Sequence, residues 1–134
     1  MRFEFPVREV ETPFGPLPEP VLECGVHTPR GVVPFRFFLD TGADVSIVPA
    51  SAASFIGMSL DGAAPMDVGG IEGGSLRAAV SSLTLRFGST DLAVPCLVSS
   101  IEETPYLLGR AGIFDRFNVL FDNAGRRIVL EGIE

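Results

Sequence analysis

The residues best suited to chemistry lie in one short stretch, Phe38-Leu39-Asp40-Thr41-Gly42-Ala43-Asp44. Phe35, Phe37 and Leu39 alternate along a strand, which places the carboxyl group of Asp40 at its polar end. A hydroxyl residue and a glycine then turn the chain sharply. Activation of a water molecule by aspartates alone needs two carboxylates that share one proton. The chain contains a single Asp-Thr-Gly. The sequence therefore predicts half of a site, completed by a second copy of the chain.

Asp40 also has a simpler interpretation, because an aspartate before Thr-Gly is common in turns. The strand before it is heavily aromatic, however, which predicts a carboxylate set into an apolar wall. Burying a carboxylate without a partner is costly, so an aspartate that only makes a turn is usually found in a wetter setting. We therefore favour a catalytic role.

Two further segments follow in order, Val68-Gly69-Gly70-Ile71-Glu72-Gly73-Gly74 and Tyr106-Leu107-Leu108-Gly109-Arg110. With Asp40-Thr41-Gly42-Ala43-Asp44 they resemble the motifs of the retropepsin family, the single-domain homodimeric aspartic proteases of retroviruses and their cellular and bacterial relatives. The glycine-rich segment is similar to the flap of that family. The resemblance covers roughly residues 31 to 122.

This resemblance implies an all-β fold, a closed β-barrel of the acid-protease half type with a flap hairpin and one or two short helices. It implies an aspartic endopeptidase that works as a homodimer, with Asp40 from each protomer activating a water. The expected partners are a second copy of the chain and extended peptide or protein substrates. The mechanism implied by the resemblance needs no cofactor and no metal.

The resemblance also assigns roles to individual residues. Asp40, Thr41 and Gly42 would form the catalytic turn, in which Thr41 hydrogen-bonds across the two-fold axis and Gly42 leaves room for a substrate backbone. Asp44 and Arg110 would form an ion pair beneath the site. Structural support would come from Leu107, Leu108 and Gly109. The residues expected to line the substrate are Ala43, Asp44, Val45, Ile47, Gly69, Gly70, Ile71 and Glu72.

Glu72 departs from the retroviral pattern, in which glycine is usual. A residue with a side chain disfavours positive φ, and its charge adds to an acidic cleft. Together with the proline-rich start of the chain, Glu72 favours an alternative: a dimerisation or peptide-binding module with the same fold and little or no turnover.

Composition and charge exclude other classes. The net charge is −7, which argues against a nucleic-acid surface, since phosphate binding needs clustered positive charge. We expect no membrane partner, because no apolar run reaches spanning length. The first residues lack the apolar core of a signal peptide, so we expect a cytoplasmic protein. There Cys24 and Cys96 are better explained as reduced core residues than as a disulfide.

The single histidine, His27, has no second histidine or cysteine pair at metal-ligand spacing, so a zinc site is disfavoured. A Ser-His-Asp hydrolase is equally unsupported, because no Gly-x-Ser-x-Gly motif occurs.

The pattern predicts a lead segment at residues 1–20 and a retropepsin-like domain at residues 21–134. In the lead segment we expect a terminal strand over 2–11 and then an extended or turned proline-rich stretch. In the domain, alternation and turn residues predict strands, a hairpin over 66–80 and helical turns at 50–56 and 113–117. A phase change at 81–82 predicts a bulge or bend, and Pro95 hints at an edge strand. The strands expected in the domain are 21–26, 32–39, 46–48, 83–87, 92–98, 119–121 and 128–130.

Overall fold

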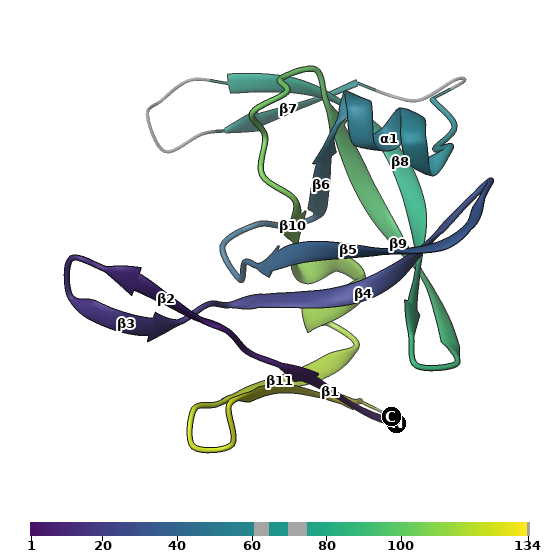
Figure 1. The fold of residues 1–134 in the computed structure, drawn as a ribbon. Coiled ribbons are helices and arrows are strands. Elements are labelled where there is room, and N and C mark those ends of the chain that lie inside the picture. The colour runs from purple at the N-terminus through teal and green to yellow at the C-terminus, as the bar shows by residue number, and fades with distance from the viewer. Residues whose placement is uncertain (61–64, 70–74, 134) are drawn as a thin grey trace.

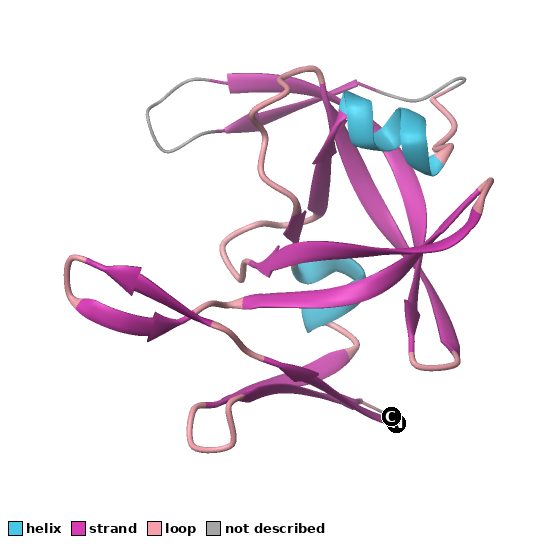
Figure 2. Ribbon diagram, in the orientation of Figure 1, coloured by secondary structure: helices cyan, strands magenta, loops and turns pink. Residues whose placement is uncertain are grey.

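The computed structural model describes residues 1–60, 65–69 and 75–133. These described residues are mostly β, with two short helical segments (Figure 1, Figure 2). The elements in chain order are β1 (Arg2–Pro6), β2 (Glu9–Thr12), β3 (Gly15–Pro18), β4 (Val21–Thr28), β5 (Gly31–Leu39), β6 (Ser46–Pro49), α1 (Ala50–Ile56), β7 (Pro65–Gly69), β8 (Ser75–Phe87), β9 (Thr90–Ser99), β10 (Leu107–Leu108), η1 (Arg110–Phe114), β11 (Phe117–Asp122) and β12 (Arg127–Gly132).

The largest sheet closes on itself. Its strand order is β4-β5-β10-β6-β9-β8-β7, and β4 also pairs with β8. The antiparallel pair β4–β5 runs from Thr28↔Gly31 at its turn to Val21↔Phe38 at the open end. Because β4 bonds to strands from both ends of the order, six strands form a ring with β7 outside it. The predicted all-β barrel is confirmed.

The barrel encloses one main hydrophobic core. Phe37, Leu22 and Leu85 are fully buried there, and burial of such side chains contributes about 1.5–3 kcal/mol each. Both cysteines are buried and unpaired. Burial raises the pKa of each thiol to about 12, with the charge of Glu23 adding to the effect at Cys24. Each thiol is therefore a core group.

The phase change in β8 has a different cause from the one predicted. β8 pairs with β9 without a break from Ala78↔Ser99 to Phe87↔Thr90, so the bulge expected at residues 81–82 is wrong. Ala78 lies in a small cluster with Ile47 and Leu97, whereas Leu83 and the following inward residues belong to the main core. Since alternate side chains point to opposite faces, the strand changes which face is buried without changing its register.

Pro95 is also placed differently from the prediction. β9 lies inside the sheet, between β6 and β8, and is not an edge strand. Its pairing with β6 begins only at Cys96, opposite Ser46. Pro95 thus precedes the doubly paired part of the strand, where a missing N–H disrupts no pairing with β6.

Only one of the two helical segments has the bounds that the sequence predicts. The predicted turns at residues 50–56 are confirmed as α1, which ends at Gly57 in the left-handed conformation (φ 80°). The segment predicted at 113–117 begins earlier, as η1 at Arg110, and residue 117 already belongs to β11. Non-helical angles at Ala111 and Gly112 interrupt η1, and Gly112 has φ 89°, a conformation that favours glycine.

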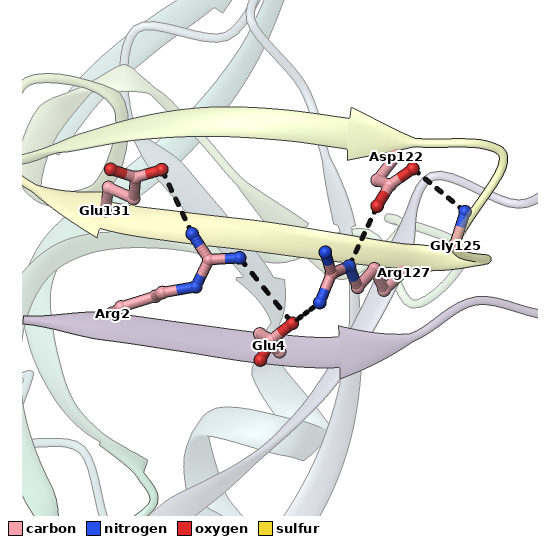
Figure 3. A network of polar contacts seen from close by, with 6 residues as sticks. All are labelled: Arg2, Glu4, Asp122, Gly125, Arg127 and Glu131. Atoms are coloured by element: carbon pink, nitrogen blue, oxygen red, sulfur yellow. Dashed lines mark hydrogen bonds and ion pairs between the residues drawn. The ribbon is translucent and has the colours of Figure 1, made fainter.

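The two ends of the chain form a separate three-stranded sheet, β1-β12-β11. A polar network spans it: Arg2 donates to Glu131 at 3.3 Å, and Arg127 donates to Asp122 at 2.8 Å and also to Glu4 (Figure 3). The terminal strand predicted over 2–11 is divided in the structure: β1 pairs with β12 of its own chain, whereas β2 pairs with β3 in a separate hairpin. The domain boundary at residue 20 stays a prediction.

Candidate active site

β5 carries Asp40 to the open end of the barrel. The last residues of β5 lie between two strands, with Phe38 paired to Val21 of β4 and Leu39 parallel to Leu108 of β10. Inward-facing Leu39 is buried, as the alternation predicts. The N–H of Asp40 donates to the Leu108 carbonyl at 3.0 Å. The backbone of Asp40 is therefore held by the end of the sheet while its side chain enters the following turn.

The Asp-Thr-Gly turn closes on the carboxylate. Asp40 Oδ1 accepts a hydrogen bond from the Gly42 N–H at 2.8 Å, and the Asp40 carbonyl accepts one from Ala43 at 3.2 Å. A Cβ at Gly42 would lie 3.1 Å from Asp40 Oδ1, so a side chain would crowd the carboxylate. Asp40 is half-buried, whereas Thr41 and Gly42 are exposed in the single chain. The turn thus presents one oriented carboxylate at an open surface.

The segment after β10 holds the loop that follows Asp40 from behind. A Cβ at Gly109 would lie 2.5 Å from the carbonyl carbon of Val45 and 2.8 Å from its nitrogen, so only glycine fits. The N–H of Arg110 donates to the Ala43 carbonyl, and that of Ala111 to the Asp44 carbonyl, each at 2.9 Å. Two backbones are therefore in direct contact, which fixes the position of the loop after Asp40.

Ser46, to which none of the sequence motifs points, belongs to this support. Its side chain is fully buried and its hydroxyl accepts a hydrogen bond from the Gly109 N–H at 3.1 Å. One sequence feature indicates this role: Ser46 comes directly before the apolar run Ile47-Val48-Pro49. A hydroxyl group buried beside such a run must find a hydrogen-bond partner.

Asp44 and Arg110, predicted to pair, do form an ion pair. The Asp44 side chain is 85% exposed and that of Arg110 is 55% exposed in the single chain. Solvent screens such a pair, so it contributes little to the stability of one protomer. The pair instead helps to position the loop after Asp40, because Asp44 and Arg110 flank the contact between the two backbones.

Of the other residues predicted to line the substrate, the structure describes some and not others. Val45 is half-buried and packs on a small cluster that contains Ile47, which is itself buried. Gly69 ends β7, where it pairs with Ser75 of β8. Gly70, Ile71 and Glu72 lie outside the described residues. The hairpin predicted over 66–80 thus has two described strands, and its expected tip is the part that the structure does not describe.

Neither a metal cluster nor a membrane helix is found in the described part of the chain. No group of three or more His, Cys, Asp and Glu residues there could hold a metal ion, and no helix there is long and apolar enough to span a membrane. A cavity of about 230 Å³ lies at the base of the β2–β3 hairpin, lined by Val7, Pro20 and Phe121 among others. Asp40 does not line it, so this cavity is not the candidate active site.

Comparison with known proteins gives this geometry a family. The model of the family described as aspartyl protease matches residues 27–111, more than half of the chain. The chain belongs to the aspartyl protease family. The matched residues include Asp40 and also Gly109, whose close contact with Val45 was described above. No curated protein matches this chain.

Solved structures agree on the fold. A retropepsin-like aspartic protease from Rickettsia conorii superposes with a TM-score of 0.62 at 16% identity, covering 97% of this chain and 89% of that chain. The EIAV protease in complex with the inhibitor HBY-793 superposes with a TM-score of 0.53 at 20% identity, covering 69% of this chain and 82% of that chain. This family member therefore has a retropepsin-like fold, as its motifs predict.

Proposed function

We propose that the protein is a homodimeric aspartic endopeptidase, in which two copies of the chain each contribute Asp40. One observation carries the proposal: each chain offers a single Asp-Thr-Gly carboxylate, oriented by the Gly42 N–H and open at the end of the barrel. A carboxylate dyad needs two such groups at close range. A two-fold axis beside this turn would supply the second, since both partners then present the same surface.

In the proposed mechanism the two Asp40 carboxylates share one proton. The ionised one takes a proton from a water held between them, and that water attacks the carbonyl carbon of the scissile peptide bond. The protonated one polarises the carbonyl oxygen and stabilises the tetrahedral intermediate. Proton transfer to the amide nitrogen then lets the C–N bond break, and the dyad again carries one proton. The backbone contact at Gly109 would keep each carboxylate in position throughout.

The proposed substrate is an extended peptide lying across both protomers. β7 ends the order of the main sheet, so one of its edges is unpaired within the described sheet. An extended segment can add to such an edge through backbone hydrogen bonds, while its side chains enter neighbouring subsites. In this proposal the β7–β8 hairpin acts as a flap over the substrate, and half-buried Val45 contributes to an apolar subsite beside Asp40.

The test is cleavage of a diverse peptide library by the wild-type protein and by Asp40→Asn. We expect the variant to lose detectable cleavage, because an amide cannot accept the proton, while its circular dichroism and thermal midpoint stay close to wild type. Asp91→Asn is the matched control, since it makes the same chemical change in the β8–β9 region and should retain full activity. Cleavage by Asp40→Asn at the wild-type rate would show that another residue does the chemistry. A folded wild-type dimer that cleaves no peptide would favour the binding-module alternative.

A further inference from the structure

The β2–β3 hairpin leaves the barrel at the edge where Asp40 is presented. Two residues after β3, the Pro20 carbonyl accepts a hydrogen bond from the N–H of Leu39 at 2.9 Å. Its neighbour Glu19 forms an ion pair with Arg36 of β5. The hairpin therefore begins beside the residue that precedes Asp40, and it extends to the left of Figure 1, the side where the loop between β5 and β6 also lies. If two Asp40 residues meet, the hairpin lies at the same face.

The hairpin itself is almost entirely uncovered. Every residue of β2 and β3 is exposed or half-buried, and none is buried. Phe14, in the turn between them, is 90% exposed, and Val10 and Leu17 are 37% and 44% exposed. A two-stranded hairpin is only marginally stable alone, and an exposed apolar group of this kind marks a contact surface more often than an isolated residue does.

A second turn in the same protein shows that turn chemistry does not require phenylalanine at this position. Thr12-Pro13-Phe14-Gly15 and Thr28-Pro29-Arg30-Gly31 make the same contacts: each threonine hydroxyl donates to the glycine carbonyl at 2.7 Å. Each threonine oxygen also accepts from the N–H two residues on, at 3.0 Å and 3.1 Å. Both glycines have positive φ, 95° and 107°.

The two turns differ in what occupies the third position. Arg30 lies over the ring of Phe55 in its own chain, 5.7 Å from the ring centroid, whereas Phe14 is almost fully exposed. A geometry that accepts arginine in one turn places an apolar ring in the other. The turn geometry therefore does not account for the exposed ring of Phe14.

The prolines of β3 indicate how such a contact is made. Pro16 and Pro18 lie opposite Glu11 and Glu9, at alternate positions of the strand. Since Thr12↔Gly15 closes the turn, these positions fall on pairs that exchange no backbone hydrogen bonds, so the missing N–H groups are on the outer edge. That edge cannot donate at two successive outward positions, which disfavours adding another strand there. At the outer edge of β3, a contact is therefore made more readily through side chains than through the backbone.

We propose that the β2–β3 hairpin is a dimerisation arm, whose Phe14 packs against a second copy of this chain and holds the two Asp40 turns together. The inference rests on the proposed dimeric function, because it is the need for a second Asp40 that places a partner at this edge. The arm is isologous: each protomer gives one Phe14 and receives one. An aromatic side chain exposed at the end of a projecting element is typical of the anchors that dominate interface energies.

The test compares Phe14→Arg with wild type by sedimentation over a range of protein concentrations. The substitution copies the third residue of the Thr28 turn, so the turn should form as before. We expect the dimer dissociation constant to rise at least about tenfold, with unchanged far-ultraviolet circular dichroism. Phe14→Ala should weaken the dimer without adding charge. Arg30→Ala, at the matched position of the other turn, should leave dimerisation unchanged.

A photo-crosslinking residue in place of Phe14 provides a direct readout. In a mixture of normal and isotope-labelled chains, crosslinks should join one chain to the other. Crosslinks confined to a single chain, or a Phe14→Arg dimer as tight as wild type, would overturn the arm. A Phe14-dependent dimer that cleaves no peptide would support the arm while contradicting the proposed peptidase. Reduced cleavage by Phe14→Arg with unchanged dimerisation would assign the hairpin to substrate binding and overturn the arm.

Discussion

Replacing Gly109 with alanine should displace the loop that follows Asp40 without changing Asp40, the proposed catalytic residue. The added methyl group would lie 2.5 Å, 2.6 Å and 2.8 Å from the carbonyl carbon, carbonyl oxygen and nitrogen of Val45. All three atoms belong to the backbone, so no side chain can rotate away. Reaching an ordinary contact of 3.4 Å from 2.5 Å requires a shift of 0.9 Å, at a position five residues after Asp40.

The expected magnitude follows from that shift. A displacement of about 1 Å in a catalytic group can cost about 100-fold in rate, so we expect kcat/KM for peptide cleavage to fall by about that factor. Overpacking of this kind destabilises by about 1–3 kcal/mol, and separation from Ser46 would remove one buried hydrogen bond. Chemical denaturation and peptide kinetics on the same preparations measure the two effects.

Gly132→Ala is the matched control for this substitution. A Cβ at Gly132 would lie 3.5 Å from its nearest neighbour, the Met1 carbonyl oxygen, which is an ordinary contact. This variant should keep wild-type kinetics and nearly wild-type stability. If Gly109→Ala behaved in the same way, the close contact with Val45 would not position the loop, and the argument from that contact would be refuted.

Two further predictions concern pH. Burial raises the pKa of the Cys24 and Cys96 thiols to about 12; their contribution to stability is therefore complete below the unfolded value of about 8.5 and declines as pH rises toward 12. A thiol reagent at pH 8 should label neither cysteine until denaturant is added, and rapid native labelling would contradict their burial. Hydrogen bonds from Arg86 and then His27 lower the pKa of Asp91 to about 2, so its contribution is present above about 3.9 and is lost as pH falls through 2. Thermal midpoints between pH 5 and pH 2 should therefore fall less in Asp91→Asn than in wild type, and parallel curves would refute that linkage.

The strands that position Asp40 could be predicted because their local signals agree. Phe37 and Leu39 alternate toward the core, and a Thr-Pro-x-Gly turn separates this strand from its partner. The helix at residues 50–56 could be predicted equally well, since a glycine such as Gly57 readily takes the left-handed conformation that ends a helix.

The features that were missed depend on tertiary contacts. The phase change after Val80 predicts a bulge or bend because a sequence shows only that the apolar face changes. The two clusters that cover opposite faces of β8 become visible only in the fold. The hydrogen bond from Gly109 to Ser46 joins positions far apart in the chain, so the sequence could suggest that Ser46 needs a partner but not which one. The same limit applies to the β2–β3 hairpin: its prolines predict an extended segment, but they do not predict that the two strands pair with each other.

The most direct test of the central claim is the peptidase activity of wild-type protein titrated with Asp40→Asn. If the active site needs one Asp40 from each of two copies, mixed dimers are inactive. With random pairing, equal amounts of the two proteins should leave about half the activity that the same wild-type chains show alone, with further loss as the variant is added. Activity per wild-type chain that stayed constant across the titration, under conditions where the chains exchange, would show that one chain carries a complete site and would contradict the account.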